Sequence, residues 1–379
     1  MPASVPGVTY VLPIKVGAPA GEELTDYLRR VATWCPVVVV DGSADDVFAA
    51  HDEAWRGFLS HRRVTSRTVN GKVAGTVDGV AAATTPLVVL ADDDVRYDEA
   101  ALTEVVALLQ DHDAVVPQNY FDPLPWHARW DSGRSLLNRA LGHDYAGTAG
   151  VRRDALLGSR GYCGAVLFEN LEMLRTLAAR GGRIRHAKDV FVARRPPTFR
   201  HFLGQRVRQA FDSEAQRPRQ ALELAGLPLL AAATVAGPRW LLGAAAVTVG
   251  VAEAGRRAAG GRRVFAPDLA LWSPCWAVER SVCAWLAVAS KARGGVLYAG
   301  RRLGTSAHPV GRLRAAGCPE RTCRCDTVLR PAQTPEETPA ETQPETPGGT
   351  PAATPGTTFD RPVRLGGSRA VPATSARGG

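Results

Sequence analysis

An uninterrupted apolar run, Leu87–Ala91, leads directly into three consecutive aspartates, Asp92, Asp93 and Asp94. A short run in which every residue is apolar is typical of a strand buried on both faces of a sheet. The carboxylates must then emerge at the carboxyl end of an interior strand, which is where ligands bind in open α/β sheets. This feature predicts an α/β domain with a polar site at the edge of its sheet.

Short β-branched runs alternate with helical stretches through the first half of the chain, which indicates a mixed, mainly parallel sheet. We expect strands at residues 8–13, 37–40, 63–65, 87–91, 114–117, 148–151 and 190–193. We expect helices at residues 22–32, 47–60, 72–83, 98–110, 130–141 and 171–180. The domain built from these elements is assigned to residues 1–215.

Composition favours acidic partners. The chain has 379 residues and a net charge of +9, which suits nucleotide phosphates, anionic lipid or nucleic acid. Its seven cysteines lack paired spacing, which favours a reducing compartment; the group Cys318, Cys323 and Cys325 has no clear fourth ligand for zinc. Residues 1–6 lack the features of a signal peptide, so we expect the catalytic part to stay in the cytoplasm.

The composition changes after residue 215. Residues 222–252 and 267–290 are apolar stretches with charge near their middle, so they can insert in a membrane, lie in its interface or form a soluble helical subdomain. We assign residues 216–303 to a membrane-associated helical segment at the cell membrane. Residues 304–379, rich in Thr-Pro units, are expected to be a disordered tail.

Two other polar motifs lie at the ends of predicted elements, as the triplet does. Asp41 ends the second strand before Gly42-Ser43, and Asn70-Gly71-Lys72 precedes a predicted helix. Each can contact a nucleotide, and each is also an ordinary turn or helix start. The acidic triplet is the stronger signal because carboxylate oxygens are the ligands that Mg²⁺ or Mn²⁺ prefers. Strand alternation sends Asp92 and Asp94 to one side and Asp93 to the other.

Taken together, these motifs resemble the family-2 glycosyltransferases that have the GT-A fold. The first four blocks are Val11-Leu12-Pro13, Val39-Val40-Asp41-Gly42-Ser43, Asn70-Gly71-Lys72 and Leu90-Ala91-Asp92-Asp93-Asp94. Four more are Gly147-Thr148, Arg152-Arg153, Phe168-Glu169-Asn170-Leu171-Glu172 and Gln205-Arg206-Val207-Arg208-Gln209. The resemblance covers residues 8–215 and is strongest to the membrane-associated branch of ceramide glucosyltransferases and cellulose-synthase-like enzymes.

The resemblance implies a metal-dependent, inverting transfer of a sugar from a nucleotide-diphosphate sugar, with UDP expected, to a hydroxyl acceptor such as a lipid or a cell-envelope glycan. It implies no nucleic-acid partner. The implied nucleotide-sugar contacts are Asp41, Lys72, Asp92, Gln205 and Arg208, and the implied ligands of Mg²⁺ or Mn²⁺ in the DxD motif are Asp92 and Asp94.

Two positions depart from the family pattern. Asn170 stands where the family has its catalytic aspartate, and an amide cannot accept the acceptor proton, so Glu169 and Glu172 are the candidate bases. Gln209 replaces a tryptophan, which argues against processive polysaccharide synthesis. The alternatives are a nucleotidyltransferase and a catalytically impaired membrane scaffold that binds a nucleotide sugar.

Overall fold

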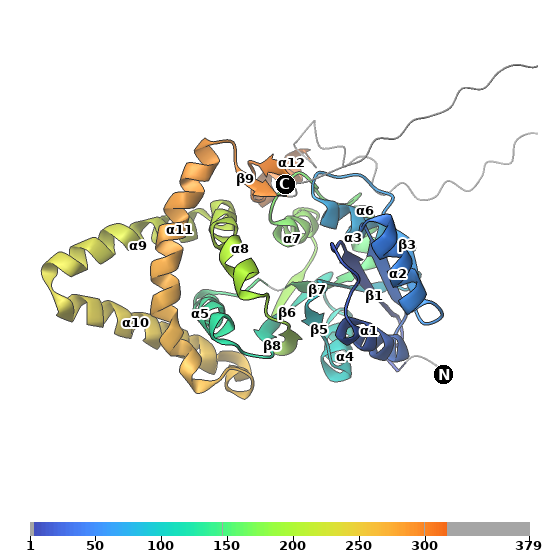
Figure 1. The fold of residues 1–379 in the computed structure, drawn as a ribbon, viewed down its shortest axis with the longest axis horizontal. Coiled ribbons are helices and arrows are strands. Elements are labelled where there is room, and N and C mark those ends of the chain that lie inside the picture. Colours follow the sequence, from blue (N-terminus) through green and yellow to red (C-terminus); the bar gives the residue numbers. More distant parts are fainter. Residues whose placement is uncertain (1–3, 146, 299, 317–379) are drawn as a thin grey trace, which may run out of the picture. The chain divides into compact units, whose positions relative to one another are not determined.

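The computed structural model describes residues 4–145, 147–298 and 300–316. The Thr-Pro-rich sequence from residue 327 and the cysteine group at residues 318–325 lie outside these residues. The described part contains a mixed sheet of eight strands in the order β3-β2-β1-β4-β7-β6-β8-β5 (Figure 1). The predicted α/β fold class is confirmed.

One half of this sheet is parallel. Its strands are β1 (Val8–Ile14), β2 (Val37–Asp41), β3 (Ser60–Arg63) and β4 (Leu87–Ala91). Every residue of β2 and β4 is buried, as expected for apolar strands covered on both faces. Parallel pairing brings the carboxyl ends of these strands to one edge of the sheet, so the acidic triplet emerges there.

The other half contains antiparallel pairs. Strand β7 (Thr148–Arg152) pairs antiparallel with β4 and with β6 (Ala114–Phe121). Strand β8 (Ile184–Arg194) runs parallel to β6 and antiparallel to β5 (Val95–Arg96). As a result β7 begins, and β8 ends, at the edge where β4 ends. The start of β7 and the end of β8 therefore both lie close to the acidic triplet.

Helices cover both faces of the sheet. Helices α1 (Glu22–Trp34) and α4 (Glu99–Leu108) contribute to one apolar core, beside α2 (Asp45–Trp55). Helices α3 (Gly71–Ala82), α6 (Arg153–Gly158) and α7 (Glu169–Ala179) contribute to the other. Helix α3 packs so closely on β1 that a Cβ atom at Gly79 would clash with Cγ1 of Val11.

Further helices pack beside the sheet domain and form what we call the helical layer. It consists of α5 (Trp126–Leu141), α8 (Phe199–Phe211), η1 (Asp212–Ala215), α9 (Arg217–Ala236), α10 (Pro238–Arg257), η2 (Ala258–Arg263), η3 (Pro267–Trp272) and α11 (Ser273–Ala292). Helix α11 contacts α5, α8 and α9. Helices α9 and α10 form a hairpin that projects from this layer (Figure 1). Within the described ranges, no helix combines the length and the apolarity needed to cross a membrane.

Residues 296–316 fold back onto α7. Strands β9 (Val296–Tyr298) and β10 (Arg301–Leu303) form a small hairpin, and α12 (Val310–Ala316) contacts α7. The backbone N–H groups of Leu167 and Phe168 donate to the carbonyls of Thr305 and Ser306 at 3.0 and 2.9 Å. The expected start of a disordered tail at residue 304 is therefore too early, because residues 304–316 belong to this folded unit.

We predict that Glu172→Ala destabilises the protein. Glu172 is fully buried, and its two carboxylate oxygens lie 2.7 Å from the backbone nitrogen and 2.8 Å from Nδ1 of His308. Removing it leaves these buried groups without their acceptor, at a cost of about 2–3 kcal/mol or several degrees in Tm. Thermal unfolding followed by circular dichroism measures this. Glu104→Ala, at an exposed position of α4, is the control, and equal Tm values for the two variants would contradict the prediction.

Candidate active site

A pocket of about 1190 Å³ opens at the carboxyl edge of the sheet. The sheet and the helix starts next to it form one wall, which includes Lys72, Asp92, Asp93, Asp94, Glu169, Asn170 and Arg194. The helical layer forms the other wall, which includes Gln205, Arg208, Asp212, Arg219 and Arg280. The pocket thus unites most of the residues predicted from the sequence, over a span of more than 100 positions.

Lys72 lies at the centre of the sheet-side wall. Its Nζ atom is 2.5 Å from Oδ1 of Asp92 and 2.6 Å from Oε1 of Glu169. Asn70 holds it in place, because the Asn70 side chain caps α3 by accepting from the backbone N–H of Lys72. Burial alone would lower the pKa of Lys72, but the two carboxylates raise it above its ordinary value, so the side chain is charged.

Arg194 is a second cation in this wall, and the sequence analysis missed it. Its Nε atom donates to Oδ2 of Asp94 at 2.7 Å, and its Nη2 atom is 3.6 Å from Oδ2 of Asp92. Gly147 leaves room for this pair, since a Cβ atom there would lie 2.8 Å from Oδ2 of Asp92. Arg194 follows the last predicted strand, so the strand-end argument that found the triplet would also have found it.

Asp94 retains an oxygen for a ligand. Its Oδ1 atom is buried and has no hydrogen-bond partner among the described residues. Burial raises the pKa of Asp94, Arg194 opposes this, and the net shift is upward. A divalent cation would relieve this unfavourable burial of charge. Asp94 and Asp92 therefore fit the predicted Mg²⁺ or Mn²⁺, with phosphate oxygens or water completing the coordination.

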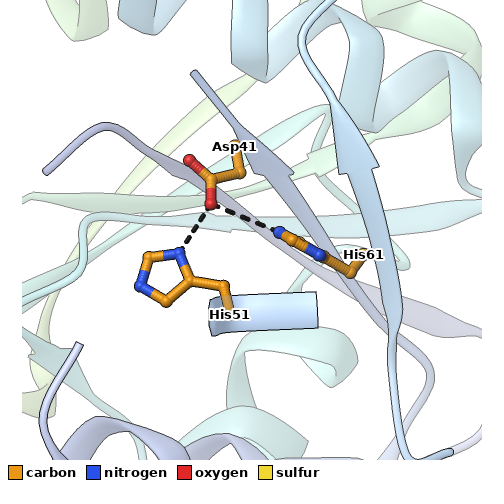
Figure 2. A group of neighbouring side chains, drawn as sticks. All are labelled: Asp41, His51 and His61. Carbon is orange, nitrogen blue, oxygen red and sulfur yellow. Dashed lines mark hydrogen bonds and ion pairs between the residues drawn. The ribbon is translucent and has the colours of Figure 1, made fainter. Parts of the chain in front are cut away.

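Asp41 occupies a different position from the one predicted. Its carboxylate is fully buried, and Oδ2 lies 2.6 Å from Nδ1 of His51 and 3.3 Å from Nε2 of His61 (Figure 2). Its Oδ1 atom accepts the backbone N–H of Ser43 at 2.7 Å. Burial raises the pKa of Asp41, but the hydrogen bonds from His61, His51 and Ser43 outweigh burial and hold the pKa well below its ordinary range. Asp41 thus fixes the loop after β2, while its neighbour Gly42 lines the pocket.

The Asp41, His51 and His61 side chains are close enough to resemble a metal site. The backbone N–H of Ala20, however, donates to Nε2 of His51 at 2.8 Å. The proton of neutral His51 must then be on Nδ1, where it is donated to Asp41, and a protonated nitrogen cannot bind a metal. This cluster is a hydrogen-bonded support for the loop.

Helix α8 separates the residues of the predicted Gln205–Gln209 block. Gln205 and Arg208 line the pocket, and the Arg208 guanidinium lies 5.4 Å from the ring centroid of Tyr298. Arg206 points instead into the helical layer, where it is bonded to Asp131 and Glu279 at 2.9 and 2.6 Å. The block therefore places the cation of Arg208 in the pocket and the cation of Arg206 inside the helical layer.

The two candidate bases are also separated. Glu169 lies in the pocket, whereas Glu172 is fully buried behind it and bonded to His308. The prediction of Glu172 as a base is wrong for this geometry: one helical turn places the two carboxylates on the same side of α7, but residues 304–308 cover Glu172.

Asp212, at the start of η1, is another carboxylate that the sequence analysis missed. It lines the pocket, and its Oδ1 atom is buried without a hydrogen-bond partner among the described residues. Burial raises its pKa from 3.8 to about 7, opposed by Arg208 and reinforced by Glu169. No local pattern indicates this role, because the burial arises from packing of distant segments.

We predict that Asp212→Asn changes the pH dependence of stability. A carboxyl whose pKa is raised by folding stabilises the native state at low pH, and this contribution is lost as pH rises from about 4 to about 7. The variant should gain several degrees of Tm relative to the wild type between pH 4.5 and pH 8. Thermal unfolding at both pH values measures the difference, and a Tm difference independent of pH would overturn the prediction.

Comparison with known proteins supports the sequence-based resemblance. Residues 30–162 match the family model of glycosyl transferase family 2. No curated protein sequence matches the chain. The similar solved structures include the mannosyltransferase PcManGT from Pyrobaculum calidifontis, in complex with GDP-Man and Mn²⁺, at 18% identity and a TM-score of 0.44 over 74% of this chain and 87% of that chain.

Two others are bacterial proteins. TarS 1-349 from S. aureus is 15% identical with a TM-score of 0.37, over 54% of this chain and 64% of that one. Glucosyl-3-phosphoglycerate synthase from M. tuberculosis is 15% identical with a TM-score of 0.35, over 52% and 74%. The residues that match the family model, 30–162, include Lys72 and the acidic triplet.

Proposed function

We propose that this protein is a glycosyltransferase that transfers a sugar from a nucleotide-diphosphate sugar, with UDP as the expected nucleotide, to a hydroxyl acceptor with inversion. The observation that carries the proposal is the convergence of Lys72, Arg194, Asp92 and Asp94 in one pocket at the carboxyl edge of the sheet, within or next to the family-2 region. Such a pocket has both the cations for a diphosphate and the carboxylates for a metal.

When a nucleotide-sugar donor binds, the cations of the sheet-side wall can exchange their carboxylate partners for phosphate oxygens. Lys72 and Arg194 neutralise Asp92 and Asp94. Phosphate oxygens can replace these carboxylates as partners of the two cations, and Arg208 on the opposite wall adds a third. Asp92 and Asp94 would then hold Mg²⁺ or Mn²⁺, which when bound neutralises charge on the diphosphate leaving group. Gln205 lies where it can orient the sugar or the acceptor.

A carboxylate in the pocket must accept the proton of the acceptor hydroxyl. Glu169 keeps this role from the sequence prediction, although Lys72 binds its Oε1 atom. Asp212 is the second candidate, because it faces the same pocket and its pKa of about 7 is matched to proton transfer at neutral pH. The amide of Asn170 cannot serve.

Asn170 also favours one alternative function, a catalytically impaired protein that binds a nucleotide sugar without transferring it. The donor side of the pocket would be unchanged in such a protein, since Lys72, Arg194 and the acidic triplet do not depend on residue 170. Binding of UDP with Mn²⁺ in the absence of any transfer or hydrolysis would identify it.

We also propose that the α9–α10 hairpin places the protein on an anionic membrane surface, with the pocket on the cytoplasmic side and a lipid as one candidate acceptor. The hairpin exposes large apolar side chains on most sides: Leu222 62%, Leu229 61%, Val235 91%, Trp240 57%, Leu242 70% and Val247 67%. Its buried residues are only Glu223, Ala252 and Gly255. The exposed apolar side chains of this helix pair favour contact with another apolar phase, and basic residues such as Arg256 and Arg257 suit anionic lipid.

We predict that Asp94→Asn lowers sugar transfer or donor hydrolysis at least 100-fold in the presence of Mn²⁺, because the amide is a poorer metal ligand and lacks the charge that Arg194 binds at 2.7 Å. A screen of UDP-sugars with UDP release as the readout measures this. Glu104→Gln is the control, because this carboxylate is exposed on α4 and does not line the pocket. Equal activity of the wild type and Asp94→Asn would refute the site, and pyrophosphate release from a nucleoside triphosphate would indicate a nucleotidyltransferase.

We predict that the double variant Val235→Glu, Leu242→Glu weakens membrane binding at least tenfold, because each change places a charge on the apolar surface of the hairpin. Flotation with phosphatidylglycerol vesicles, compared with phosphatidylcholine vesicles, measures binding. Leu141→Glu is the matched control, since Leu141 is 72% exposed but lies in α5. Failure of the wild type to float, or equal flotation of all variants, would exclude the hairpin as the membrane contact.

A further inference from the structure

Arg280 is a buried cation in the wall of the pocket. It lies in the middle of α11 and its side chain is 1% exposed. None of its three guanidinium nitrogens has a hydrogen-bond partner among the described residues. The guanidinium lies 5.1 Å from the ring centroid of Trp276, so one of its faces is covered by an aromatic ring. A guanidinium has five N–H donors, and leaving all of them unpaired in the interior is costly.

The neighbouring carboxylates attract Arg280 electrostatically but make no hydrogen bond to it. Arg219 donates to Oε1 of Glu223 at 2.9 Å, and Arg206 donates to Oε2 of Glu279 at 2.6 Å. Their other oxygens are buried and have no hydrogen-bond partners in the described structure, so neither reaches Arg280. Burial lowers the pKa of Arg280 to about 10, which still leaves it charged at neutral pH. Arg280 is therefore a charged donor group without an acceptor.

Arg280 lies next to the proposed site of chemistry. The carboxyl of Asp212 interacts electrostatically with Arg208 and Glu169 and also with Arg280. Lys72 forms ion pairs with both Asp92 and Glu169. The pocket therefore has a continuous series of charged side chains from the proposed donor site, through Glu169 and Asp212, to Arg280. Arg219 lines the pocket as well and adds a second guanidinium beside Arg280. A group bound at Arg280 would have its remaining atoms directed toward Asp212 and Glu169.

We propose that Arg280 binds an oxyanion of the acceptor, so that the acceptor is a hydroxyl compound that also carries a phosphate or a carboxylate. This inference rests on the proposed glycosyl transfer and specifies its acceptor class. The oxyanion accepts the N–H groups that no protein atom accepts, and it orients the hydroxyl toward the donor. A soluble phosphorylated alcohol and the headgroup of a phospholipid share this chemistry.

The test compares pairs of compounds that differ in the anion. Full-length protein saturated with UDP and Mn²⁺ is titrated calorimetrically with glycerol 3-phosphate, with glycerate and with glycerol. The wild type should bind at least one of the two anions at least tenfold more tightly than glycerol. Arg280→Gln should lose this preference, whereas Arg301→Gln, an exposed pocket residue, should keep it. Phosphatidylglycerol vesicles and phosphatidylcholine vesicles that contain diacylglycerol, used as acceptors in a transfer assay, distinguish a lipid source from a soluble one.

The outcomes separate this inference from the proposed function. If the wild type binds neither anion better than glycerol, or if Arg280→Gln keeps the preference, Arg280 is not the acceptor site. Unchanged affinity for UDP shows that Arg280→Gln is folded; if the variant does not fold, Arg280→Lys replaces it and should retain only part of the preference. Affinity for UDP should be unaffected in either variant, and absence of donor hydrolysis from the wild type would count against the proposed function instead.

Discussion

The pocket depends on the ion pairs that Lys72 makes with Asp92 and Glu169. These residues belong to α3, to the end of β4 and to the start of α7, so a single ammonium group connects three elements at the carboxyl edge of the sheet. Arg194, at the end of β8, connects a fourth through Asp92 and Asp94. Paired charges of this kind contribute little net stability, because desolvation offsets their attraction. Instead, these pairs hold cationic and carboxylate side chains in the pocket, where either can bind a charged ligand.

Sequence reasoning located the sheet-side wall of the pocket because that wall is encoded locally. A buried strand, a strand end and a helix cap are each visible in a few residues, and parallel pairing brings them together. Lys72, Asp92 and Asp94 were found in this way. The same reasoning misplaced Asp41, since a strand-end aspartate looks alike whether it faces a ligand or is bonded to His51 and His61. Only the position of α2 and β3 decides between the two.

The opposite wall could not be predicted from the sequence for a related reason. Glu172 is covered by residues 304–308, more than 130 positions later, and the raised pKa of Asp212 comes from burial by several distant segments. Arg280 is part of an apolar stretch that the sequence suggests as a membrane element. In the structure α11 has two roles: one face carries Arg280 into the pocket, and another leaves Val278, Val282 and Trp285 exposed. An apolar sequence pattern does not indicate which face of a helix is covered, or which part of the protein covers it.

Together, Arg280 and Asp212 connect acceptor binding to the strength of the base. The positive charge of Arg280 lowers the pKa of Asp212, although burial raises it more. An oxyanion bound to Arg280 would cancel that charge, so the Asp212 carboxylate would become more basic when the acceptor is present. Where this carboxyl is deprotonated, the increase makes it a stronger acceptor of the hydroxyl proton in the complex where transfer can occur. The replacement of the family's aspartate by Asn170 is therefore compatible with catalysis, provided that the carboxylate on the helical side performs the proton transfer.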